Sequence, residues 1–213
     1  MKSVLISIKP KYCELIAAGK KTIEVRKTKP RIETPFKCYI YCTLPKERYS
    51  IGQGNYAYSD NLYLCDNKVK FGEGFEDIGN ETTSLNGKII GEFVCDEILC
   101  FPYVEGEEAG EYVYNIPTVI GEQTCLDYGD VSNYGNGKSL YFWHISNLVI
   151  YDEPKELSKF YTWCPEYERE YITSKCTKCR YYLINEFDGC FECACEGEKL
   201  LTRSPQSWCY VEV

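Results

Sequence analysis

Short apolar or alternating segments, separated by turn residues, predict a fold built mainly from β-strands. These segments are rich in β-branched and aromatic residues, which suit the pleated surface of a sheet. The most apolar stretch covers residues 140–150 and is expected to be a core strand. The predicted strands are Ser3–Ile8, Thr22–Arg26, Lys37–Thr43, Lys88–Leu99 with a bulge at Gly91, and Leu140–Ile150.

One helix is predicted between the first two strands, over Lys11–Ala18, where apolar and aromatic residues recur at helical spacing. Pro10 suits the first helical turn, and Gly19 follows at the position of a left-handed cap. A second, short helix is expected within Tyr151–Phe160. Asp127–Gly137 is rich in Gly and Asn and indicates a turn.

The order of these elements predicts the fold class. The strands form neither a strand–helix series nor a regular repeat, so an α+β fold is expected: a small mixed β-barrel with one or two packed helices. This domain is predicted to cover residues 1–160, with an insertion at about 46–87 that is rich in Gly, Asn, Ser and Tyr. Residues 161–213 lack a comparable core pattern and form a Cys-rich extension.

Composition excludes several classes of protein. The chain has 213 residues, of which 44% are hydrophobic and 15% aromatic, which is too apolar for an intrinsically disordered protein. No run approaches the roughly 18 apolar residues that a membrane helix needs, so no membrane partner is expected. The first apolar run is cut off by Lys9, Pro10 and Lys11, unlike a signal peptide. A soluble, cytoplasmic protein is therefore expected.

Charge is distributed unevenly along the chain. The net charge is −8, but residues 1–50 hold 12 Lys and Arg against 4 Asp and Glu, a net of +8. The remaining 163 residues hold 12 against 28, a net of −16. This asymmetry predicts a basic patch that attracts phosphate or another anion on an otherwise acidic body. The alternative is a set of solvated lysines.

Seven of the 14 cysteines crowd into the last 50 residues. Cys176, Cys179, Cys190 and Cys193 follow a C-x2-C-x10-C-x2-C spacing, which lets two thiolate pairs bind one tetrahedral ion. A structural zinc ion is the predicted cofactor, because four thiolates favour zinc. Buried free thiols or a redox pair are the alternatives. The spacing also lets Cys164, Cys195 or Cys209 replace one of these ligands.

Candidate binding chemistry gathers after the first helix. Glu24 and Arg26 share one face of the predicted strand, Lys21 stands at its start, and Lys9 precedes the helix. Glu24 can pair with Arg26 and fix the guanidinium, which then suits a phosphate or the edge of a base. A surface ladder of salt bridges would explain the same spacing.

The segment SIKPKYCELIAAGKKTIEVRK resembles the ASCH domain family, a branch of the PUA-like β-barrels. The family motif G-x-K-x-x-E-x-R stands complete as Gly19, Lys21, Glu24 and Arg26, and a closing strand of the type YFWHISNLVIYDEPKEL fits as well. The resemblance covers about residues 1–160. It implies a PUA-like barrel and a ligand-binding groove formed by Lys9, Gly19, Lys21, Glu24 and Arg26.

The resemblance implies binding of RNA or a modified nucleotide, with bases stacked on aromatic side chains. Tyr56, Tyr58 and Tyr63 are the candidates for stacking. An alternative is a hydrolase acting on RNA or a modified nucleoside, with Lys21 and Glu24 as its catalytic residues. Similar amidohydrolases have a Thr nucleophile at the position of Glu24, and this departure weakens that activity.

Two further expectations concern the tail and the single histidine. The ending PQSWCYVEV is similar to tails of phage and prophage ASCH proteins, which suggests an anti-defence protein that binds a host protein or a nucleotide signal. His144 lies in the apolar strand 140–150 and is expected to be a core residue rather than a catalytic base.

Overall fold

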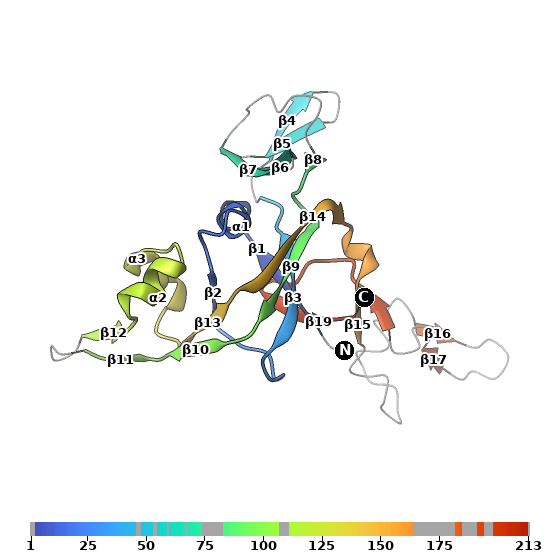
Figure 1. Cartoon of the computed structure of the whole chain (residues 1–213). Coiled ribbons are helices and arrows are strands. Elements are labelled where there is room, and N and C mark those ends of the chain that lie inside the picture. The colour runs from blue at the N-terminus through green and yellow to red at the C-terminus, as the bar shows by residue number, and fades with distance from the viewer. Residues whose placement is uncertain are drawn as a thin grey trace.

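The fold consists mostly of strands, with a few short helices (Figure 1). The computed structural model describes residues 3–45, 48–52, 55–58, 60–66, 68–73, 83–106, 111–163, 182–184, 191–193 and 198–212. In this part of the chain, no helix has the length and apolar character that crossing a bilayer requires.

A five-stranded sheet forms the centre of the molecule. Its strands lie in the order β14-β9-β3-β1-β19, and β1 and β3 are parallel while the other neighbours are antiparallel. The parallel pair is connected through α1, Pro10–Ala17, and the short strand β2. The sheet comprises β1 Ser3–Ile8, β3 Phe36–Cys42, β9 Ile89–Cys95, β14 Ser146–Lys155 and β19 Trp208–Val211.

A second sheet has three strands in the order β10-β13-β2. These strands are β10 Ile98–Phe101, β13 Leu140–His144 and β2 Ile23–Arg26. Two segments predicted as single strands cross from one sheet to the other: β9 continues into β10, and β13 continues into β14. The predicted bulge lies beside Gly91, where the pairing of β9 with β3 shifts by one residue.

The described strands do not close into the predicted barrel. Strands β14 and β19 end the five-stranded sheet, and β2 ends the smaller one, without pairing to each other in the described part of the chain. The free edge of β2 lies beside α1 and α3, Tyr128–Gly135, and residues of all three elements line one pocket. Helices and polar side chains therefore lie at the edge where another strand would be needed for closure.

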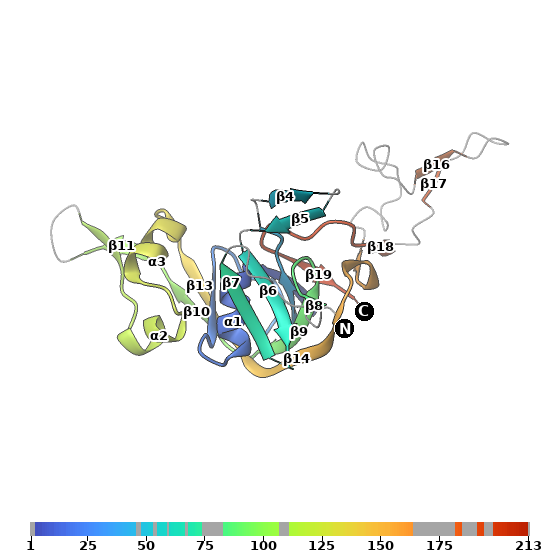
Figure 2. The same ribbon diagram turned by 90° about the horizontal axis from the view of Figure 1, so that it is seen from above.

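The segment expected as an insertion packs onto the main domain. Strands β4 Arg48–Gly52 and β5 Asn55–Tyr58 pair with each other, and β6 Asp60–Cys65 pairs with β7 Lys68–Glu73 and β8 Thr83–Ser84. The β6–β7 hairpin lies over α1 (Figure 2). Leu62 and Leu85 are buried in the main core, and the Phe71 amide donates to Glu14 of α1.

The segment between β10 and β13 forms one end of the molecule. It comprises β11 Tyr103–Glu105, β12 Tyr112–Tyr114, α2 Thr118–Gln123 and α3. The predicted turn at Asp127–Gly137 is wrong, because α3 occupies it. Val131 of α3 packs with Ile23, Val25 and Phe142 from the smaller sheet.

The predicted C-terminal extension starts and ends on the central sheet. Phe160 is fully buried beside Leu5 and Tyr39, and β19 pairs with β1. The 3-10 turn η1, Leu157–Lys159, precedes Phe160. Between Phe160 and β19 lie β15 Tyr161–Trp163, β16 Tyr182–Ile184, β17 Phe191–Cys193 and β18 Glu198–Leu200. The short helix predicted within Tyr151–Phe160 is a single 3-10 turn. The domain boundary at residue 160 stays a prediction.

Candidate functional site

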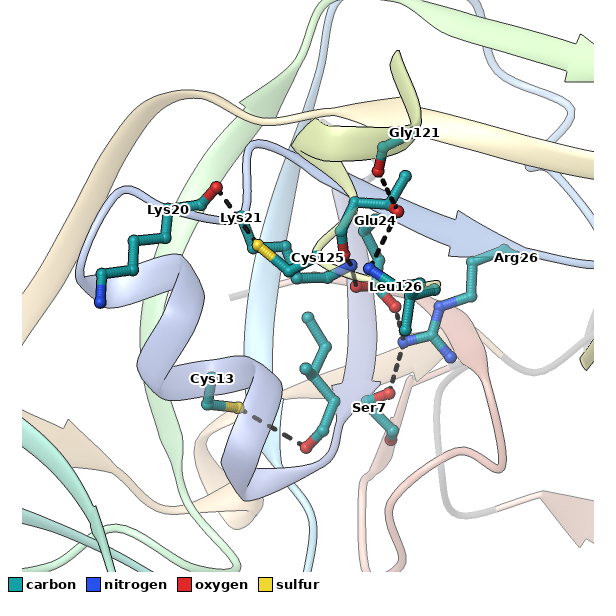
Figure 3. Close-up of polar contacts among 11 residues, drawn as sticks. Ser7, Cys13, Lys20, Lys21, Glu24, Arg26, Gly121, Cys125 and Leu126 are labelled. Atoms are coloured by element: carbon teal, nitrogen blue, oxygen red, sulfur yellow. Dashed lines mark hydrogen bonds and ion pairs between the residues drawn. The ribbon is translucent and has the colours of Figure 1, made fainter. Parts of the chain in front are cut away.

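The turn after α1 delivers Lys21 to the interior. Gly19 has φ = +69°, which a residue without a side chain adopts at little cost. The Gly19 amide donates to the Ile16 carbonyl, and the Lys20 amide donates to the Leu15 carbonyl. This pair of hydrogen bonds defines a Schellman motif. The helix therefore ends at once, and Lys21 enters the protein while Lys20 points away (Figure 3).

Strand β2 buries both of its faces. Ile23 and Val25 pack into the cluster around α3, whereas Glu24 and Arg26 lie on the opposite face. The register pairs Glu24 with the core residue Trp143. In the described part of the chain, the charged residues that are buried are Lys21, Glu24 and Arg26, which expose 2, 7 and 7% of their surface.

These three side chains form one ionic cluster (Figure 3). Glu24 Oε1 lies 3.0 Å from Arg26 Nη2, and Glu24 Oε2 lies 3.4 Å from Lys21 Nζ. Lys21 Nζ also donates to the Thr124 carbonyl at 2.6 Å, and it lies 5.3 Å from the centroid of the Tyr12 ring. Glu24 therefore serves as the shared partner of two buried cations.

Arg26 is fixed from its other side by the C-terminal segment. Its Nη2 donates to the Ser7 carbonyl at 2.6 Å, and its Nη1 lies 3.5 Å from Ser207 Oγ. Ser7 is itself held by residues 205–207: its amide donates to Ser207 and its hydroxyl donates to the Pro205 carbonyl. The terminal nitrogens of the guanidinium are thus engaged within the protein.

A pocket of about 300 Å³ opens beside the cluster. Three basic and two acidic side chains line it, together with two tyrosines from different helices. Its lining residues are Ser7, Ile8, Lys9, Tyr12, Lys21, Glu24, Val25, Arg26, Leu126, Asp130 and Tyr134. The volume lies at the lower end of the range for ligand pockets, so it suits a small ligand or one unit of a larger one.

Two buried polar atoms in this lining lack a hydrogen-bond partner among the described residues. They are Glu24 Oε2, which faces Lys21 only as an ion pair, and Arg26 Nε. Buried polar atoms are nearly always hydrogen-bonded in folded proteins. The wall of the pocket therefore contains one acceptor and one donor that no described residue hydrogen-bonds.

Both tyrosines of the pocket stay protonated at neutral pH. Burial raises the pKa of Tyr12, and the carboxylates of Asp130 and Glu24 raise it further. Burial also raises the pKa of Tyr134, against the opposing effect of Arg26. Neutral phenol rings can stack on a planar ligand and donate a hydrogen bond to it.

The structure brings together four of the five predicted binding residues. Lys9, Lys21, Glu24 and Arg26 line the pocket, and Gly19 forms the turn behind it. The sequence analysis missed seven of the lining residues: Ser7, Ile8, Tyr12, Val25, Leu126, Asp130 and Tyr134. Asp130 and Tyr134 lie in α3, and the sequence signal for this helix is the N-cap residue Asp127. The turn predicted over Asp127–Gly137 hides that signal.

The predicted zinc ligands fall largely outside the described residues. Cys176, Cys179 and Cys190 lie outside them, and Cys193 is described only as backbone within β17. In the parts of the chain that the structure covers, no group of three potential ligands comes together. Cys209 lies in β19 as a free thiol, and burial raises its pKa to about 11. The zinc site stays a prediction.

The single histidine is not the core residue that was expected. The His144 side chain is 40% exposed, and its Nδ1 lies 2.7 Å from Asp96 Oδ1. That contact lowers the pKa of Asp96. The difference arises because β13 ends at His144, and the next residue, Ile145, is the one whose side chain is buried in the core. His144 is not among the residues that line the pocket.

The cap of α3 is expected to stabilise one wall of the pocket. Asp127 Oδ1 accepts the Asp130 amide at 2.6 Å. Asp127→Ala should lower the free energy of unfolding by about 1 kcal/mol, whereas Asp127→Asn should change it by only a few tenths, because Asn is an equally good N-cap. Urea unfolding of both variants measures this difference. An equal loss in the two variants would contradict the capping role.

The fold is similar to crystal structures of the ASCH protein from Zymomonas mobilis. The unmutated protein is 14% identical, with 73% of each chain covered and a TM-score of 0.42. A tyrosine-to-phenylalanine mutant is 15% identical, with 74% of this chain and 77% of that chain covered and a TM-score of 0.43. No model of a known protein family matches the sequence, and no curated protein matches it either.

Proposed function

We propose that the chain is an ASCH-type binding protein whose pocket between α1 and α3 holds one base of an RNA or nucleotide ligand. The observation that carries this proposal is the pocket lined by Glu24 and Arg26, in which Glu24 Oε2 and Arg26 Nε have no hydrogen bond among the described residues, although Oε2 is ion-paired with Lys21. A ligand that satisfies both needs a donor and an acceptor of its own. Nucleobase edges carry such groups side by side.

The same geometry disfavours a phosphate in the deep part of the pocket. Arg26 Nη2 is ion-paired with Glu24 and donates to the Ser7 carbonyl. This terminal nitrogen is therefore not free to bind a phosphate. A phosphate placed at Arg26 Nε would also approach the Glu24 carboxylate and be repelled by it. A base edge brings no such charge.

The rim of the pocket suits the remainder of a nucleotide. Lys9 lines the pocket and is exposed to solvent at the start of α1. Its ammonium group can therefore contact a phosphate while remaining hydrated. Tyr12 and Tyr134 supply aromatic rings for the base from two different helices.

The hydroxyl groups of Thr22 and Ser7 are not placed as activated nucleophiles, which favours binding over covalent hydrolysis. Thr22, the threonine next to Lys21, is not among the lining residues. Ser7 does line the pocket, but its hydroxyl donates to the Pro205 carbonyl at 2.7 Å. A nucleophilic hydroxyl needs a base as its partner instead. The hydrolase alternative therefore gains no support from these residues.

The Glu24→Gln variant tests the proposed base contact. It keeps the size of the side chain but removes the charged acceptor, and a hydrogen bond to a charged group contributes about 1.5–3 kcal/mol. We expect affinity for the best-binding nucleoside monophosphate to fall about 10- to 100-fold. Calorimetric titration with the four common ribonucleoside monophosphates measures it, and circular dichroism shows whether the variant is folded.

A matched control is Glu122→Gln, on the exposed surface of α2, which should bind like the unmodified protein. The proposal fails if no monophosphate binds the unmodified protein. It also fails if folded Glu24→Gln binds with unchanged affinity.

A further inference from the structure

A basic segment leaves the pocket along the protein surface. Residues 27–31 follow Arg26 directly and carry Lys27, Lys29 and Arg31, with no acidic residue among them. Lys29 and Arg31 are exposed and Lys27 is half-buried. This local charge contrasts with the net of −16 over residues 51–213.

Aromatic side chains from three elements lie against this segment. Lys27 Nζ is 4.9 Å from the centroid of the Tyr134 ring in α3, and Lys29 Nζ is 5.9 Å from that of Tyr141 in β13. From β19, Trp208 Nε1 donates to Thr28 Oγ1 at 3.0 Å, and the Tyr210 hydroxyl accepts the Arg31 amide at 2.6 Å. We call this surface the basic strip: residues 27–31 with Tyr134, Tyr141, Trp208 and Tyr210.

The basic strip is continuous with the pocket. Tyr134 belongs to both, since it lines the pocket and carries Lys27 over its ring. Tyr141 is the register partner of Arg26 on the neighbouring strand. A ligand that places one unit in the pocket would therefore have its adjoining unit at Lys27 and Tyr134.

We propose that the basic strip binds the nucleotides that flank the base in the pocket, so that the ligand is a single-stranded polynucleotide rather than a free nucleotide. This inference rests on the proposed function of the pocket. Alternating cations and aromatic rings are the combination that single strands require, because phosphates contact the cations and bases stack on the rings. The contacts with the tyrosine rings also hold the flexible side chains of Lys27 and Lys29 close to where the polynucleotide would bind.

The basic strip has to attract a polynucleotide to a protein of net negative charge and prefer it to an acidic peptide. The net negative charge of residues 51–213 disfavours a polyanion on the rest of the protein, so the cations of the strip direct it as well as attract it. An acidic peptide would profit from the same cations. It would gain less from the aromatic rings, of which Tyr134 is exposed and the other three are half-buried, because ring surfaces suit planar bases better than peptide carboxylates.

A length series of single-stranded RNA tests the strip. We expect affinity of the unmodified protein to rise at least tenfold from the mononucleotide to a six-nucleotide strand. Lys27→Gln, Lys29→Gln and Arg31→Gln combined should remove this gain and leave mononucleotide affinity within twofold. The slope of log affinity against log salt should fall by about 2, since each phosphate contact on a single strand contributes about 0.7. Fluorescence anisotropy with labelled strands gives both quantities.

The control combines Lys68→Gln, Lys70→Gln and Lys159→Gln, which remove the same charge from exposed positions outside the strip. It should retain the gain with length. The inference is overturned if the strip variant binds six nucleotides as tightly as the unmodified protein, or if a poly-glutamate peptide competes as well as the strand. Failure of the proposed function is distinct, because mononucleotide binding itself would then be missing.

Discussion

Replacing Glu24 by alanine is expected to lower the free energy of unfolding by about 3 kcal/mol. The change leaves Lys21 and Arg26 buried side by side without the carboxylate that now lies within 3.4 Å of both. Breaking a buried ion pair by removing one partner typically costs 3–5 kcal/mol. The open pocket admits some water to these charges, so we expect the lower end of that range. Urea unfolding followed by far-ultraviolet circular dichroism measures the loss.

The control for this prediction is Glu122→Ala, because Glu122 is exposed and surface substitutions usually stay within about 0.5 kcal/mol. A loss below about 1 kcal/mol for Glu24→Ala would mean that the two cations are hydrated from the pocket. The three charges would then contribute little to the fold, and the pocket would be far more adaptable than the ionic cluster suggests.

Replacing Trp143 by alanine is expected to cost about 3–5 kcal/mol of unfolding free energy. The side chain is fully buried and packs edge-on against Phe36, with a ring distance of 5.8 Å. Truncation of a core Trp leaves a large cavity. Because Trp143 is the register partner of Glu24, the same variant should also loosen the pocket.

Trp143→Phe separates the packing of this residue from its polar atom. Trp143 Nε1 is buried and has no hydrogen-bond partner among the described residues, which costs the folded state about 1–3 kcal/mol. Phe keeps most of the ring and lacks this donor, so a net loss below about 1.5 kcal/mol is expected. An equal loss in the Phe and Ala variants, measured by urea unfolding, would contradict this account.

Local patterns predicted the part of the fold that lies near the N-terminal motif. The segment Ser3–Ile8 forms β1, and the helix predicted over Lys11–Ala18 forms one residue earlier as α1. Gly19 ends the helix as expected. These elements depend on periodicity and on turn residues, which act over a few positions.

The elements that the sequence analysis missed depend on tertiary packing. Helix α3 contains Gly129, Gly135 and Asn133, which favour turns, yet it is held by Val131 in the core and by the Asp127 cap. A Cβ on Gly135 would meet the Tyr114 hydroxyl, so this glycine is there for close packing rather than for a turn. Local propensity cannot reveal such a reason.

The candidate site also divides into residues that a local sequence pattern predicts and residues that only tertiary packing brings together. Its ionic residues were predicted because Lys21, Glu24 and Arg26 lie within six positions of one another. Its remaining parts come from α3 and from residues 205–207, and no local pattern links these to β2. The β-barrel was predicted from the order of the strands and from the resemblance to PUA-like barrels, neither of which shows where a helix occupies the edge of a sheet.

The contact between Arg26 and Ser207 has a consequence for synthesis of the chain. The two residues are 181 positions apart, and β19 pairs with β1 across a similar separation. Because synthesis runs from the N-terminal to the C-terminal side, the ribosome produces Arg26 181 residues before Ser207. Until β19 emerges, the edge of β1 that it covers is unpaired and open to other nascent chains. Arg26 therefore gains its contact with Ser207 only after most of the domain has been synthesised.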